Sequence, residues 1–141
     1  MSEQSTTPDL VELTRRSLEA GLKEVDAGMS SFARDAVWEV PALGTRLEGV
    51  EAIRGFLVDW RGSFAEFEID LQEVLNMGNG VVLTSAQSNA ILQGGAMPLH
   101  QLFAYVAVWI QGEISRVTVY TDIGEARAAA EQLVEERRRD G

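Results

Sequence analysis

The spacing of apolar residues differs between the two halves of the chain. In the first half, apolar side chains recur every three or four positions, which is typical of helices with one buried face. This spacing predicts a helix from Thr7–Pro8, an N-cap followed by proline, to about Ala27, and a second helix over 49–60. Between the two helices, residues 32–35 predict a helical turn and residues 36–40 a short strand.

The second half of the chain alternates between apolar and polar residues, which is typical of strands with one wet face. Turn residues divide it into four predicted strands, which begin at Phe67 and continue over 81–91, 99–110 and 114–121. Asp122 is expected to cap a last helix. Helices that are separated from a run of antiparallel strands predict an α+β fold.

The amino-acid composition limits the kinds of binding partner that we expect for this protein. The chain has 141 residues, of which 45% are hydrophobic, enough for a single core. We expect a disordered tail over residues 1–6 and one domain over residues 7–139. The 22 acidic residues outnumber the 12 basic ones, and the net charge of −10 repels phosphate groups and anionic lipids. We therefore expect neither nucleic acid nor a membrane as a partner.

The residue types also bear on metals and location. The chain has no cysteine and a single histidine, so thiolate chemistry, disulfides and histidine-rich metal sites are excluded. We predict no metal site and no cofactor. The N-terminus lacks the basic and apolar regions of a signal peptide, and we expect a cytoplasmic protein.

Several segments together resemble a known superfamily. They are DAVWEVP at 35–41, GVEAIRGF at 49–56, GEISRVTVYTD at 112–122 and the pair Glu125–Ala126. In order and spacing they are similar to the SnoaL-like branch of the nuclear transport factor two-like superfamily. The resemblance implies a cone-shaped, curved, predominantly antiparallel sheet, wrapped by helices around an internal cavity, and a homodimer.

Members of this superfamily include polyketide cyclases, steroid isomerases, epoxide hydrolases and non-catalytic binding modules. The position of the isomerase base is Val40 here, and the hydrolase relay has no counterpart between Leu102 and Ile110. The cyclase base matches Asp122. The resemblance thus implies a cyclase or isomerase in which a carboxylate removes a proton from an apolar, carbonyl-containing substrate. The alternative is a non-catalytic small-molecule binding or dimeric association module.

The predicted hairpin at Gln111–Gly112 assigns faces to the last two strands. A two-residue turn pairs Val106 with Val117, and this aliphatic face is assigned to the cavity because the other face carries Arg116. The predicted ligand-binding residues are Trp38, Trp60, Leu102, Ala104, Val106, Val117, Val119 and Thr121. A single β-bulge would reverse part of this assignment. The aromatic face with Phe103, Tyr105, Trp109 and Tyr120 is expected to point outward and to form the homodimer.

Asp122 and His100 are the predicted catalytic residues. His100 is the only side chain whose ordinary pKa suits proton transfer near neutral pH, and it is expected near the cavity rim. Each residue also has a purely structural interpretation. Asp122 stands three residues before Glu125, as a helix cap does, and His100 fits a hydrogen-bonded strand end. Trp38 and Trp60 fit a core position as well as a cavity wall.

Overall fold

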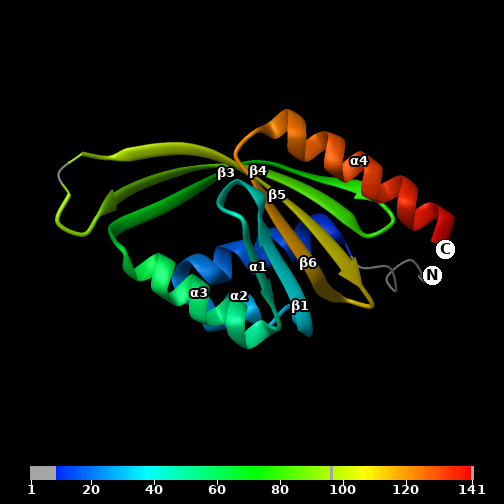
Figure 1. The fold of residues 1–141 in the computed structure, drawn as a ribbon, viewed down its shortest axis with the longest axis horizontal. Coiled ribbons are helices and arrows are strands. Elements are labelled where there is room, and N and C mark those ends of the chain that lie inside the picture. Colours follow the sequence, from blue (N-terminus) through cyan, green and yellow to red (C-terminus); the bar gives the residue numbers. More distant parts are fainter. Residues whose placement is uncertain (1–8, 96, 141) are drawn as a thin grey trace.

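The computed structural model describes residues 9–95 and 97–140. The disordered tail expected over residues 1–6 and the cap expected at Thr7–Pro8 lie outside these residues. The elements follow in the order α1 (Leu10–Lys23), α2 (Val25–Met29), β1 (Phe32–Val40), the 3-10 helix η2 (Pro41–Leu43), β2 (Thr45–Glu48), α3 (Val50–Gly62), β3 (Phe64–Gly78), β4 (Val81–Leu92), β5 (Leu99–Ile110), β6 (Glu113–Tyr120) and α4 (Ile123–Asp140) (Figure 1).

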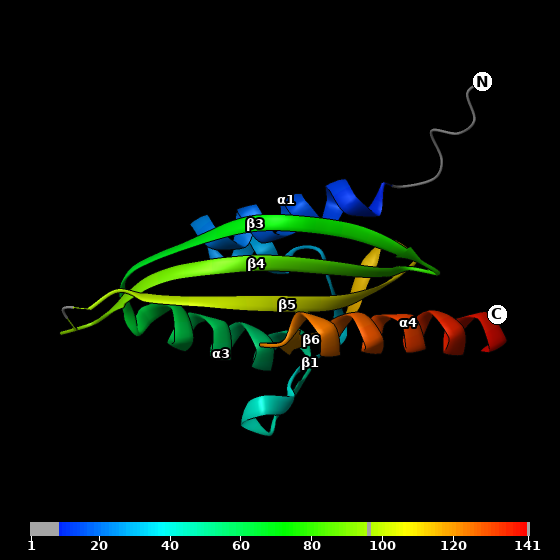
Figure 2. The ribbon, with the colours of Figure 1, turned by 90° about the horizontal axis from the view of Figure 1, so that it is seen from above.

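The strands form one six-stranded sheet in the order β2-β1-β6-β5-β4-β3. Only the β1–β6 pair is parallel, and the other four pairs are antiparallel. The long strands β3, β4 and β5 lie side by side along the molecule, and the sheet curves without closing (Figure 2). The predicted α+β fold with a predominantly antiparallel sheet is confirmed.

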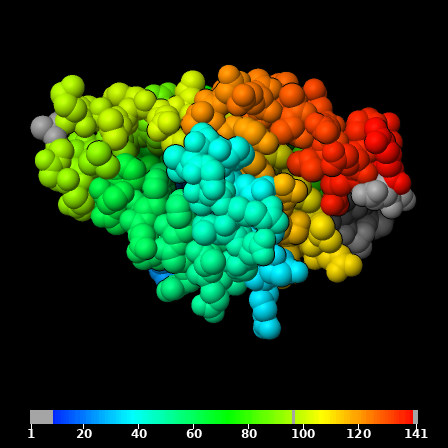
Figure 3. Space-filling model, in the orientation of Figure 1, coloured from blue at the N-terminus to red at the C-terminus, as the bar shows by residue number. Residues whose placement is uncertain are grey.

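Helices cover both faces of the sheet, because neighbouring residues of a strand point to opposite sides. Val82 belongs to a core cluster that packs against α1, whereas Val81 belongs to a cluster that packs against α4. A third cluster around Ile53 joins α2, α3 and β1. The space-filling view shows α3 and the β1–β2 pair lying next to each other on the surface (Figure 3). In the described part of the chain, no helix has the length and apolar character needed to cross a membrane.

Three expectations for the N-terminal half were wrong. The first helix begins at Leu10, where Asp9 is the N-cap, and it ends at Lys23 because Glu24 is extended, with φ −154°. Residues 32–35 belong to β1 rather than to a helical turn, since Phe32 pairs with Ile114 of β6. This parallel pairing joins segments far apart in sequence, which a local pattern does not show. Strand β2 was likewise expected to be part of a loop.

Candidate functional site

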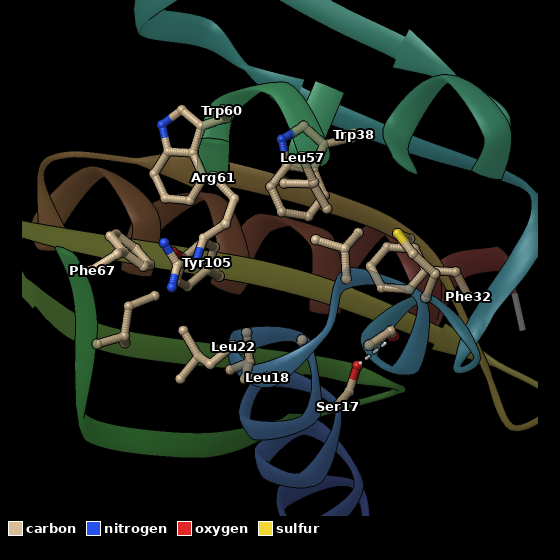
Figure 4. A pocket seen from close by; sticks show the side chains of 15 residues that line it. Ser17, Leu18, Leu22, Phe32, Trp38, Leu57, Trp60, Arg61, Phe67 and Tyr105 are labelled. Atoms are coloured by element: carbon tan, nitrogen blue, oxygen red, sulfur yellow. Dashed lines mark hydrogen bonds between the residues drawn. The ribbon is translucent and has the colours of Figure 1, made fainter. Parts of the chain in front are cut away.

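A pocket with a volume of about 110 Å³ lies between the inner face of the sheet and the helices α1, α2 and α3 (Figure 4). Its wall is almost entirely apolar. The aromatic lining residues are Phe32, Trp38, Trp60, Phe67 and Tyr105, and the aliphatic ones include Leu18, Leu22, Val25, Met29, Leu57 and Ile69. A volume of this order admits about one aromatic ring, since an engineered apolar cavity of about 150 Å³ binds benzene.

Local periodicity explains how the aromatic residues reach the pocket. On β3, Phe67 and Ile69 line it, and the acidic residues that alternate with them are exposed. On β1, Trp38 lines the pocket while its neighbour Glu39 faces away and binds the guanidinium groups of Arg116 and Arg46. Strand alternation therefore separates an apolar wall from a charged outer surface.

Aromatic rings pack edge to face at one side of the pocket. The ring of Trp60 lies 4.8 Å from that of Phe67 and 5.2 Å from that of Phe64, both at steep angles. Such geometry is favourable beyond simple burial. Because Trp60 on α3 is held by two residues of β3, its indole has a defined place in the wall. This part of the wall is therefore already formed before a flat ligand binds.

A β-bulge decides which residues of the last hairpin face the pocket. Ile110 pairs with Glu113 as expected, but Val108 pairs with Arg116 instead of Ser115, and the shift persists along the strands. Arg116 thereby points outward to Glu39. Val117 and Val119 lie on the inner face as expected, but their partners on β5 are Ala107 and Tyr105 instead of Val106 and Ala104. Arg116 avoids the apolar pocket, as expected. Its partner on β5 is Val108, however, because the bulge adds one residue to β6.

The eight predicted ligand-binding residues are therefore distributed over several environments. Trp38 and Trp60 line the pocket. Val117 and Val119 are buried in the neighbouring core, on the same face of the sheet. Ala104 and Val106 lie on the other face beneath α4, and Leu102 and Thr121 are exposed.

The aromatic face expected to point outward does not do so. Trp109 is buried, with 4% of its surface exposed, and its Nε1 donates a hydrogen bond of 3.0 Å to Thr14 Oγ1 on α1. Tyr105 lines the pocket, and Phe103 packs beside the same core cluster. Tyr120 packs against the cluster under α4 on the other side of the sheet, and α1 covers Trp109, so the four residues form no common outer face. The expected dimer surface is therefore wrong.

The two predicted catalytic residues have separate partners. Asp122 is exposed and accepts a hydrogen bond of 2.9 Å from the backbone N–H of Glu125, which is the bond of a helix cap. His100 is also exposed, and its Nδ1 is hydrogen-bonded to the side chain of Asn89 on β4. No hydrogen bond joins Asp122 and His100 in the described structure, and neither residue lines the aromatic pocket.

The pocket contains few polar atoms, and most are donors. Burial raises the pKa of Tyr105 to about 12, so its hydroxyl keeps its proton. The indole nitrogen of Trp38 is buried and has no hydrogen-bond partner among the described residues. Ser17 donates its hydroxyl to the carbonyl of Gly28 at 3.1 Å. Arg61 is the one charged group of the described lining.

Several lining residues escaped the sequence analysis. Tyr105 was placed outward because the bulge is not visible in the alternation, and Arg61 carried no motif. The alternation at Phe67 and the helical stripe at Leu18 and Leu22 did signal buried faces, but not that these faces meet. Within residues 9–95 and 97–140, no cluster of three or more acidic or histidine side chains is arranged to hold a metal ion.

Comparison with known protein families identifies the family of this chain. The sequence pattern of the SnoaL-like domain matches residues 18–117, which is more than half of the chain. The chain belongs to the SnoaL-like domain family. The predicted family is thereby confirmed. Among curated proteins, none matches this SnoaL-like domain significantly in sequence.

Solved structures share the fold. An NTF2-like protein of unknown function from Burkholderia pseudomallei is 18% identical, with a TM-score of 0.71 over 84% of this chain and 95% of that one. A Catenulispora acidiphila protein with a ketosteroid isomerase-like fold, in complex with trimethylamine, is 18% identical, with a TM-score of 0.69 over 88% and 94%. A putative polyketide cyclase from Sinorhizobium meliloti is 24% identical, with a TM-score of 0.62 over 84% and 100%. At these identities the comparison shows the fold alone.

Proposed function

We propose that this SnoaL-like domain binds a small apolar ligand, with at least one flat ring, in the aromatic pocket. The observation that carries the proposal is the wall formed by Trp38, Trp60, Phe67 and Tyr105 around a space of about 110 Å³. Ligand pockets are mostly apolar and aromatic, with a few polar groups that orient the ligand. Enzymes and binding modules share this fold, so the fold does not show which of the two this protein is. The residues of the site have to decide.

The wall favours binding over general-base catalysis. Removal of a proton next to a carbonyl requires a carboxylate or imidazole within hydrogen-bond reach of the substrate. No Asp, Glu or His side chain belongs to the described lining of the pocket. The alternative, a cyclase or isomerase with Asp122 as base and His100 as helper, draws support only from the family resemblance and from a neighbour described as a putative polyketide cyclase.

The proposal is tested by filling the pocket. Leu22 lines the pocket, and Leu22→Trp places a larger ring in the same space. Leu43 is 70% exposed on η2, so Leu43→Trp is the matched control. With toluene as a neutral one-ring probe, we expect the wild type and Leu43→Trp to bind equally and Leu22→Trp to bind at least roughly tenfold more weakly. Equal binding by all three proteins, or none by the wild type, would contradict the proposal.

A homodimer is a separate proposal, and it needs a surface other than the buried aromatic face. Leu92 and Leu99 are each exposed by more than 40% and lie on one face at the same end of β4 and β5, since Leu99 pairs with Ala90. Clustered exposed leucines often mark association surfaces. We expect a dimer in sedimentation at micromolar concentration and a shift to monomer in Leu99→Glu. A wild-type monomer under these conditions would sink the proposal.

A further inference from the structure

Arg61 has an unusual position among the charged residues of this domain. It is the one charged side chain in the described lining of the aromatic pocket. Its side chain reaches from α3 across the pocket towards Phe67, with Cζ 5.1 Å from the centre of that ring (Figure 4). A cation over a ring face is attracted by the π-electrons, and Phe67 thus holds the guanidinium at the pocket.

Several other arginines of the described residues form ion pairs with carboxylates. Arg54 is paired with Asp26, and Arg46 and Arg116 are both paired with Glu39. Arg61 has no such ion pair with a carboxylate of residues 9–95 or 97–140, although acidic residues outnumber basic ones by 22 to 12. An unpaired guanidinium beside apolar walls can receive an anion without first giving up another partner.

The other polar groups of the pocket wall are also mainly hydrogen-bond donors. Tyr105 offers a hydroxyl proton, whereas the indole N–H of Trp38 is buried and has no partner in the described structure. None of the described lining side chains is a carboxylate or a carboxamide, so the wall offers few acceptors. A ligand that accepts hydrogen bonds is complementary to such a wall, whereas a ligand that only donates them is not.

The surroundings limit where an anion can lie. Glu68 and Asp70 line an adjoining depression beside Phe67 and Ile69 and repel negative charge there. On its other side, Arg61 borders a depression that also contains Lys23 and Glu24. The guanidinium is thus the cationic group available to a ligand whose ring lies in the pocket.

We propose that the ligand of this pocket is an aromatic carboxylate, with its ring between Trp60, Phe67 and Tyr105 and its carboxylate on the guanidinium of Arg61. The inference rests on the proposed function and adds the charge of the ligand. Arginine suits this role because its planar fork can donate two parallel hydrogen bonds to a carboxylate.

The test compares three one-ring probes of similar size: benzoate, benzamide and phenyltrimethylammonium. Binding is followed by the indole N–H resonances of the three tryptophans. Trp38 and Trp60 line the pocket and should shift, whereas Trp109 is bonded to Thr14 and serves as the internal reference. We expect benzoate to bind roughly tenfold more tightly than benzamide, as a charge-assisted bond allows. Phenyltrimethylammonium should bind most weakly.

Substitutions then assign the preference to Arg61. In Arg61→Gln, the ratio of benzoate to benzamide affinity should fall to about one, and Arg61→Lys should restore part of it. Arg127 is exposed on α4, across the sheet from the pocket, so Arg127→Gln removes the same charge as a control and should keep the ratio. Circular dichroism checks that each variant is folded.

The outcomes separate the two proposals. If benzamide or phenyltrimethylammonium binds wild type as tightly as benzoate, or if Arg61→Gln keeps the preference, the carboxylate inference is overturned while ligand binding stands. If none of the three probes binds, and toluene does not bind either, both the proposed function and this inference fail.

Discussion

At the scale of single residues, polar side chains of this protein form hydrogen bonds that stabilise the fold. The indole of Trp109 reaches Thr14 across the core, and Asp122 closes the first turn of α4. Buried donors and helix N-termini both need such partners, because an unpaired polar group inside the protein is costly. The cap accounts for the position of Asp122, and its role as a base stays a prediction of the family resemblance.

Asp122 gives a prediction at this scale. Because its carboxylate accepts the backbone N–H of Glu125, Asp122→Ala should lower the free energy of unfolding by roughly 1 kcal/mol. Asp122→Asn keeps an acceptor oxygen and should lose much less. Urea denaturation measures both, and probe binding in the pocket should stay unchanged in both. Loss of binding in Asp122→Asn at full stability would show that the carboxylate has a second role.

At the scale of elements, the contact of α1 with α2 shapes one wall of the pocket. A Cβ added at Gly28 would lie 2.7 Å from the Cα of Gly21, so the two backbones touch where a side chain has no room. Gly28→Ala should therefore destabilise the protein by roughly 1–3 kcal/mol through overpacking. It should also weaken ligand binding, since Gly21 and Gly28 both line the pocket.

Gly55 on α3 is the matched control for this prediction. Apart from its chain neighbours and the backbone of α3, no atom of the described residues lies within 4 Å of a Cβ added there, so Gly55→Ala should stabilise the helix by up to about 1 kcal/mol. Thermal or urea unfolding of the two variants gives effects of opposite sign. Equal effects would mean that the close approach of α1 and α2 contributes nothing to stability.

The same scale explains which elements could be predicted. The helix α3 and the four long strands follow from period and turn residues, because their amphipathic faces are continuous in sequence. Strand β2 and the first residues of β1 did not follow. Their strand conformation depends on partners, β1 for β2 and β6 for β1, and no local pattern contains that information.

At the scale of the whole molecule, Glu39 connects three strands of the sheet. It lies on β1 and binds Arg46 of β2 and Arg116 of β6. Burial raises its pKa, but the hydrogen bonds and charges of Arg116 and Arg46 outweigh that effect and hold the pKa below the usual value of 4.5. A lowered pKa means that the charged form stabilises the fold.

The sign of this effect gives a prediction for acid stability. The contribution is complete above about pH 4.5 and is lost as the pH falls through the lower pKa of the folded state. Glu39→Gln should cost roughly 0.5–1 kcal/mol at pH 7, because both arginines are partly solvated, and less at pH 3, where the carboxyl of Glu39 is closer to its neutral form. Urea titrations at the two pH values measure the difference. A cost that is the same at both would exclude the ion pairs as its cause.

The sequence by itself determined the α+β class, the charge and the bounds of β4, β5 and β6 to within one residue, because these depend on local periodicity, composition and turn residues. The family followed from the resemblance of several short segments. It also marked Trp38 and Trp60, which lie on apolar faces of a strand and a helix. Only the tertiary structure decided which faces meet. One extra residue at Ser115 exchanged the two faces of β5 relative to β6. It brought Tyr105 to the pocket and placed Ala104 and Val106 under α4, while Arg116 stayed on the outer side, beside Glu39. Side chains alternate with a period of two along a strand, so a single bulge exchanges the faces beyond it, and the hydrophobic pattern is compatible with either outcome.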